Sequence, residues 1–214
     1  GTIWAQSAAP DKASTADKLP STIPIFPLEE AMLFPSVSRP LHIFEPRYRA
    51  MVADALKGDR IIGMVTLKPG YEGNYEGRPP IYPIGCAGLI GDVVELPGGR
   101  FNIVLQGLVK FRVLSEDDSR PYRVARVAAM PEAPDAGEQT ALHEQRQRLE
   151  ALLPQVGVDA RIPPEATDEE VVNSLAEYLT LAPLVRQTLL ELTGALPRSR
   201  ALIDLLDPKG TPLR

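Results

Sequence analysis

The fold is decided by the stretch Arg39-Pro40-Leu41-His42-Ile43-Phe44-Glu45-Pro46-Arg47-Tyr48-Arg49. Its first half is an extended apolar run, which is typical of a β-strand. Pro46 disfavours helical geometry at Glu45 and suits the first turn of a helix. Apolar side chains then recur every three or four residues as far as Leu56, and Gly58 stands where such a helix would end. The stretch therefore predicts a strand that leads directly into a helix.

Apolar segments on both sides of this corner predict further strands. Residues 23–28 are interrupted by prolines, which suits an edge strand that cannot pair along its full length. Residues 60–67 are almost continuously apolar, which indicates a strand buried on both faces. A turn signal at 97–99 and a bend at Gly107 divide the region beyond, where strands are expected at 86–96, 100–106, 108–114 and 122–130. Several short strands with glycines at their corners predict a small barrel.

The sequence period changes after a linker rich in proline and alanine at residues 131–137. Apolar side chains then follow helical spacing, and Thr167 with Glu170 forms the capping-box pattern of a helix start. Pro183 and Pro197 indicate the starts of two further helices. We therefore expect an α+β chain with a disordered tail at 1–22, a barrel subdomain at 23–130 and a helical subdomain at 138–208.

Composition narrows the class of protein. The single cysteine among 214 residues, Cys86, cannot form an intramolecular disulfide, which favours a reducing compartment and predicts a cytoplasmic location. No run approaches the roughly 18 to 20 apolar residues that a membrane-spanning helix needs. Residues 24–123 hold 12 acidic and 12 basic side chains, and residues 124–214 hold 14 and 9, which argues against a nucleic-acid partner. No metal or cofactor site is expected.

The loop at residues 68–83 is the main candidate for partner binding. It is rich in glycine and proline, and it carries Tyr71, Tyr75, Arg78 and Tyr82. Long loops in compact domains are often functional or disordered, and exposed tyrosines are common anchors at interfaces. The same tyrosines could instead fold back onto the barrel.

Catalytic residues are not predicted. Cys86, His42 and His143 are the obvious nucleophile and bases, and nothing in their spacing brings them together. A cysteine among small residues in a strand is typically a buried thiol, and His42 is expected at the surface. Glu45 is expected to stabilise the start of the helix, and Arg47 and Arg49 are expected to pair with it or with strand ends.

Six segments in this order resemble the amino-terminal substrate-binding domain of the Lon protease family: residues 24–28, 33–35, 40–48, 88–92, 99–103 and 107–113. The resemblance extends over nearly all of residues 23–206. It implies a PUA-like pseudo-barrel of about six strands with one inserted helix, followed by a C-terminal helical bundle. It also implies that the partners are unfolded or peptide segments of other proteins.

The chain departs from Lon proteases in what it lacks. It has no G-x-x-x-x-G-K-[ST] loop, and it ends at Arg214, so neither the ATPase nor the protease domain is expected. The leading hypothesis is a stand-alone, non-catalytic polypeptide-binding module that contacts neither membrane nor nucleic acid. The alternative is a small-molecule-binding or hydrolytic protein with a pocket between barrel and helices. A nucleic-acid role, known for some PUA-like barrels, is opposed by the charge balance.

Overall fold

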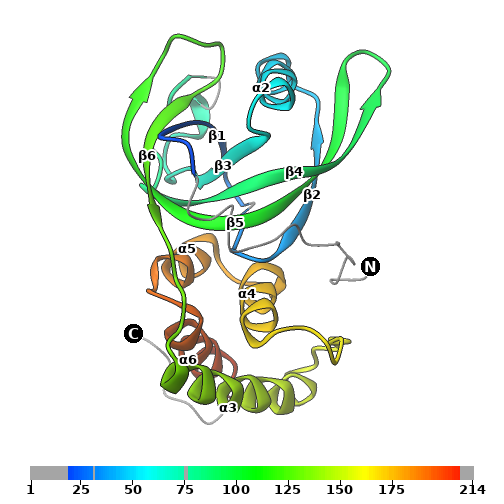
Figure 1. The fold of residues 1–214 in the computed structure, drawn as a ribbon, viewed down its shortest axis with the longest axis vertical. Helices are drawn as coiled ribbons and strands as arrows, with labels where there is room; N and C mark the ends of the chain where they lie inside the picture. The colour runs from blue at the N-terminus through cyan, green and yellow to red at the C-terminus, as the bar shows by residue number, and fades with distance from the viewer. Residues whose placement is uncertain (1–18, 31, 75–76, 208–214) are drawn as a thin grey trace. The chain divides into compact units, whose positions relative to one another are not determined.

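The computed structural model describes residues 19–30, 32–74 and 77–207, which form two compact units that divide between residues 131 and 132 (Figure 1). The first unit contains β1 (Thr22–Leu28), β2 (Ser38–Ile43), α2 (Pro46–Lys57), β3 (Ile61–Thr66), η2 (Glu72–Asn74), β4 (Ile84–Leu96), β5 (Arg100–Asp117) and β6 (Val124–Met130). The second contains α3 (Ala136–Leu152), η3 (Pro154–Val156), α4 (Asp168–Tyr178), α5 (Pro183–Glu191) and α6 (Ala195–Leu206). The tail predicted at 1–22 lies outside the described residues as far as residue 18.

The strands of the first unit close into a ring. The sheet order is β2-β5-β4-β3-β1-β6, and β5 also pairs with β6. The ring therefore consists of β5, β4, β3, β1 and β6, and β2 extends the sheet beside β5. The predicted α+β fold, with about six strands, an inserted helix and helices after the barrel, is confirmed.

The strand-to-helix corner forms as expected. Glu45 is the extended N-cap residue and Pro46 begins α2. The buried side of α2 carries Tyr48, Met51 and Val52, and the Tyr48 ring packs on Phe26 with centroids 4.4 Å apart. Because these residues recur at helical spacing, one side of the helix is buried and fixes the direction in which the chain leaves β2.

The expected edge position of β1 is wrong. Residues 22–24 pair with β6 and residues 25–28 pair with β3, so β1 has a neighbour on each side. Each neighbouring strand pairs with only about half of the residues of β1. Pro24 and Pro27, which cannot donate a backbone hydrogen bond, are tolerated because neither ladder runs the full length.

The two strands expected at 100–106 and 108–114 are one 18-residue strand, β5, so their division is wrong, although the β4–β5 pairing does shift register where Gly88 lies opposite Gly107. The Gly107 N–H donates to the Val37 carbonyl at 2.8 Å, and a β-carbon at this position would clash with the Phe34 carbonyl oxygen. Glycine therefore permits a close backbone approach within a continuous strand. The predicted burial of β3 on both faces is confirmed, since all six of its residues are buried.

The second unit is helical. The capping box of Thr167 and Glu170 is present at the start of α4, and α5 begins at Pro183 as expected. The last helix begins at Ala195, two residues before Pro197. In the part of the chain that the structure describes, no helix has the length and apolar character needed to cross a membrane.

A buried arginine holds the helical unit together. Arg198 is fully buried, pairs with Glu132 at 3.2 Å through each of two nitrogens, and donates to Asn173 at 2.7 Å. It also donates to the carbonyls of Leu189 and Leu190 in the last turn of α5, and to that of Leu192, the residue after the helix. One side chain thus satisfies backbone groups that the short helix leaves without internal partners.

Candidate functional site

An exposed aromatic side chain marks the corner between β2 and α2. Phe44 is 59% exposed, and its ring stacks on His42 with centroids 5.8 Å apart and planes inclined by 24°. His42 is held in turn by Asn102 of β5, since Nδ1 and Oδ1 lie 2.7 Å apart. Phe44 is therefore presented on a supported ring rather than on a free loop.

Strand register extends this feature into a surface. His42 of β2 lies opposite Asn102 of β5, which lies opposite Val94 of β4. Laterally paired residues share one face of a sheet, and Val94 is 55% exposed. We call His42, Phe44, Val94 and Asn102 the hairpin face. It lies where the β4–β5 hairpin and β2 run side by side in Figure 1.

Backbone hydrogen bonds join the two ends of the predicted loop at 68–83. The Lys68 N–H donates to the Pro80 carbonyl at 2.9 Å, and the Tyr82 N–H donates to the Thr66 carbonyl at 2.9 Å. Between these two bonds, Leu67 and Ile81 form an isolated antiparallel β-bridge. These bonds close the base of the loop, and its described residues include the 3-10 turn η2.

The four residues predicted for partner binding are placed differently. Tyr71 is 47% exposed near the tip, whereas Tyr82 is half-buried with the Lys68 ammonium 5.6 Å from its ring centroid. Arg78 is exposed, and Tyr75 lies outside the described residues. The structure does not gather Tyr71, Arg78 and Tyr82 into one cluster of side-chain contacts among the residues it describes.

Arg78 instead helps to line a cavity in the barrel unit. The cavity has a volume of about 130 Å³ and is lined by Arg47, Tyr48, Gly77, Arg78, Pro121 and Arg123. Arg47 pairs with Glu45 at 3.3 Å, as the sequence suggested. Arg123 pairs with Glu116 at 2.7 and 2.8 Å and donates to the Pro79 carbonyl at 2.8 Å. The loop and the first turn of α2 therefore share one arginine-rich hollow.

The residues considered for catalysis make structural contacts. Cys86 is buried in β4, with its Sγ 3.6 Å from the Ala87 carbonyl oxygen. His42 contacts Asn102 and Phe44, and His143 of α3 lies 3.1 Å from Asp168 at the start of α4. Within residues 19–30, 32–74 and 77–207, no group of three histidine, cysteine or acidic residues is placed to hold a metal ion.

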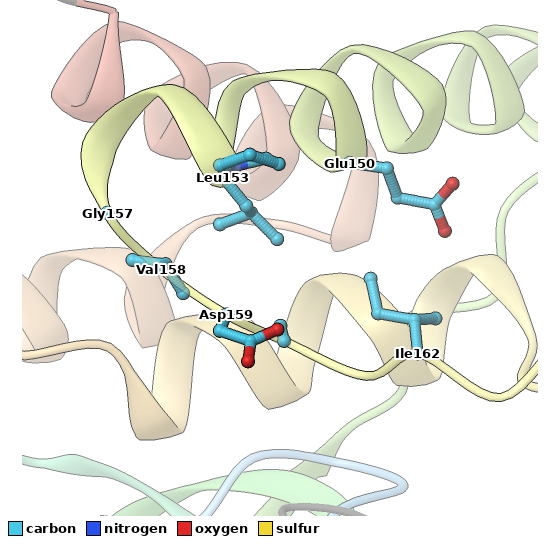
Figure 2. Close-up of a pocket in the computed structure, with 8 residues that line it drawn as sticks. Glu150, Leu153, Gly157, Val158, Asp159 and Ile162 are labelled. Atoms are coloured by element: carbon cyan, nitrogen blue, oxygen red, sulfur yellow. The ribbon is translucent and has the colours of Figure 1, made fainter.

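A larger cavity lies within the helical unit. Its volume is about 620 Å³, and Figure 2 shows Leu153 at the end of α3 and Ile162 of the following loop on opposite walls. Glu150 and Asp159 supply its carboxylates, and Val158 adds apolar surface. Its eight lining residues include no serine, cysteine or histidine among the parts of the chain that are described.

Solved structures share this fold. The N-terminal domain of Mycobacterium avium complex Lon protease aligns with a TM-score of 0.64 at 18% identity, over 88% of this chain and 99% of that one. A Lon N-terminal domain protein from Xanthomonas campestris aligns with a TM-score of 0.59 at 22% identity, over 85% and 96%. The barrel with its inserted helix and helical unit is thus a Lon N-terminal domain fold.

The family follows from the sequence. The model of the ATP-dependent protease La (LON) substrate-binding domain matches residues 22–208, and the chain belongs to this family. Lon protease 2 of Myxococcus xanthus is 27% identical over 94% of this chain, and a Lon protease of Desulfosudis oleivorans is 31% identical over 55%. The chain spans only 25% and 14% of the lengths of these two relatives.

Sequence reasoning missed the hairpin face. Phe44 counted only as a strand former, although its position two residues after His42 placed it on the side predicted to be exposed. The grouping of Arg47 and Arg123 around Arg78 had no local signal, because residues from three separate segments form the cavity.

Proposed function

We propose that this chain is a polypeptide-binding domain without catalytic activity of its own, and that the hairpin face is its contact surface. The observation that carries the proposal is the exposure of Phe44 on a ring stack fixed by Asn102. Membership of a family described as a substrate-binding domain supports it. The partners we propose are unfolded or peptide segments of other proteins, and a cytoplasmic setting stays a prediction.

The physical basis is apolar burial on a supported surface. An aromatic side chain that is more than half exposed gains roughly 1.5 to 3 kcal/mol when it becomes fully buried. The stack on His42 limits the rotamer freedom that Phe44 would lose on binding, so less of this gain is cancelled by ordering. Val94 on β4, which is separated from β2 by β5, adds exposed apolar surface to the same face.

The loop at 68–83 is proposed as a second contact. Tyr71 is available for it because nearly half of its surface is exposed. Replacing Tyr71 with alanine is expected to weaken binding about threefold, a typical loss for a contact outside the centre of an interface. Tyr82, which is half-buried beside Lys68, is expected to contribute chiefly to the loop itself.

Fluorescence anisotropy with labelled, unfolded casein tests the function. The chain should bind the probe saturably, and Phe44→Ala should weaken binding about tenfold. Leu114→Ala is the matched control, because Leu114 is 51% exposed on β5 but lies outside the hairpin face. No saturable binding, or equal losses in both variants, would contradict the proposal.

A second candidate is small-molecule binding, and the cavity of about 620 Å³ in the helical unit favours it. A hydrolytic function has less support, because that cavity offers no histidine, serine or cysteine side chain among its described lining residues. A pocket between barrel and helices stays a prediction. Casein degradation measured with and without ATP tests the hydrolytic alternative, since a binding domain alone is expected to leave casein intact.

A further inference from the structure

The strand β2 has a partner strand on only one of its two edges. In the described part of the chain it pairs with β5 alone, in a regular antiparallel register that runs from Ser38–Gln106 to Ile43–Phe101. Each of the other described strands has a neighbour on both sides, because β5 also pairs with β6 and closes the ring. Among the described strands, the outer edge of β2 is therefore where the sheet ends.

The register shows which backbone groups face this outer edge. Successive residues of an antiparallel strand direct their N–H and C=O groups alternately to one side and the other. The Gly107 N–H of β5 donates to the Val37 carbonyl at 2.8 Å, directly before β2 begins. Continued along the register, this alternation turns the backbone groups of the odd-numbered residues of β2 toward β5. Those of Pro40 and His42 face outward.

Two further observations agree with this orientation. Pro40 has no N–H to donate, and a proline is tolerated in a strand where its nitrogen faces away from the ladder. His42 and Asn102 lie opposite each other, with Nδ1 and Oδ1 2.7 Å apart. Opposite residues that exchange no backbone bonds bring their side chains closer together than residues that do.

The outward groups are accessible and regularly spaced. Pro40 and His42 are both exposed, and no described strand lies along this edge. Pro40 offers a carbonyl, and His42 offers an N–H and a carbonyl about 7 Å further along the strand. An extended polypeptide presents its own backbone groups at the same interval, so it can form three hydrogen bonds with these two residues.

We propose that an extended segment of the bound polypeptide adds to the outer edge of β2 as a further strand. This binding mode rests on the function proposed above and specifies how the backbone of the partner is held. The carbonyls of Pro40 and His42 each accept a bond from a partner N–H, and the His42 N–H donates to a partner carbonyl. Such bonds do not depend on the side chains of the partner, which suits unfolded segments of different proteins.

Strand addition also places the side chains of the partner. Residues paired across two strands share one face of a sheet, so the partner residue opposite His42 lies on the hairpin face. Phe44 follows His42 by two residues and is 59% exposed. Because every second side chain of an extended segment points to the same face, the preferred partner has apolar residues at alternate positions.

Amide hydrogen exchange at His42 tests the proposal on the natural chain. The His42 N–H should exchange at least about tenfold more slowly with saturating unfolded casein than without it, because binding supplies an acceptor. The Ile43 N–H, which faces β5, is the internal control and should be protected in both states.

The possible results separate the binding mode from the function. Casein that binds without slowing His42 exchange would overturn strand addition and leave the function of the hairpin face intact. Absence of any casein binding would overturn the function and strand addition with it. Protection of His42 that rises with the concentration of the chain alone would assign the edge to a second copy and overturn the polypeptide occupant.

A pair of variants provides a second test. His42→Ala and His42→Pro both lose the imidazole that supports Phe44, but only His42→Pro lacks the outward N–H. Since this N–H faces away from β5, the fold should accommodate proline here as it does at Pro40, which circular dichroism checks. His42→Pro should bind casein about fivefold more weakly than His42→Ala, a typical effect of one hydrogen bond. Equal affinities would overturn strand addition, and if His42→Pro does not fold, the exchange measurement decides.

Discussion

His42 and Phe44 stack with ring centroids 5.8 Å apart on the exposed side of the strand that leads into α2. The stack is held from the neighbouring strand, because Asn102 lies 2.7 Å from the His42 imidazole. Phe44 is 59% exposed, so its ring is available to a partner while it rests on the His42 ring. This relationship is the basis of the polypeptide-binding surface proposed for the chain.

Asn102→Ala should loosen the stack without unfolding the barrel. The His42–Asn102 bond is exposed, so its loss should lower the free energy of unfolding by no more than about 1 kcal/mol. Casein affinity should fall about threefold, because Phe44 would then lose more rotamer freedom on binding. Urea denaturation and fluorescence anisotropy measure the two effects, and Ser115→Ala, at an exposed position of β5 outside the hairpin face, serves as control. Unchanged casein affinity would contradict the role of the stack.

Gly107→Ala should destabilise the barrel strongly. A β-carbon there would clash with the carbonyl group of Phe34, which is backbone and cannot move aside as a flexible side chain does. The expected loss is about 3 kcal/mol or more in the free energy of unfolding. Gly73→Ala is the control, because a β-carbon at Gly73 meets no atom within 4 Å. Similar stabilities for the two variants would show that the close approach at Gly107 is not needed.

Arg198→Met should destabilise the helical unit by about 3 to 5 kcal/mol, because it removes the buried guanidinium that pairs with the Glu132 carboxylate. The Glu132 side chain is only 7% exposed, and Arg198 also bonds to Asn173 and to three backbone carbonyls. Chemical denaturation followed by circular dichroism measures the loss. Arg200→Ala, at an exposed position of the same helix, should be nearly neutral. An equal effect of the two substitutions would contradict the structural role of the buried pair.

The raised pKa of Tyr122 should make the free energy of unfolding fall at high pH. Burial and the hydrogen bond to Asp54, at 2.6 Å, raise the pKa of this phenol from 10.0 to about 12. The folded chain then holds a proton that the unfolded chain releases, so the contribution is complete below pH 10.0 and is lost as the pH rises to about 12. Urea denaturation across this range should show a shallower decline for Tyr122→Phe than for the natural chain. Parallel declines would contradict the raised pKa.

The parts of the fold that could be predicted are determined by residues close together in the sequence. The strand-to-helix corner follows from Pro46 and the helical spacing behind it, and the capping box follows from Thr167 and Glu170. The position of β1 could not be predicted, because whether a proline-containing strand has one neighbour or two depends on segments about 40 and 100 residues away. Gly107 was interpreted as a bend between two strands because its close approach to Phe34 leaves no mark in the local sequence.

The functional surfaces were harder to predict than the fold. The sequence made Arg78 a candidate for partner binding, but it did not reveal that Arg47 of α2 and Arg123 of the segment before β6 line the same cavity. The hydrogen bonding of Arg198 depends likewise on Glu132, which is 66 residues away in the chain. Such groupings arise from tertiary structure, and side-chain type alone does not reveal them.

The most direct test of the account is to map where an unfolded polypeptide binds. Backbone amide resonances of the isotope-labelled chain are followed while unlabelled, unfolded casein is added. The account predicts that the largest shifts cluster at His42, Phe44, Val94 and Asn102, and that Phe44→Ala requires about tenfold more casein to reach half of the same shifts while the fold stays intact. Shifts that concentrate elsewhere in the barrel or helical unit, or that reach half-saturation at the same casein concentration in Phe44→Ala, would contradict it.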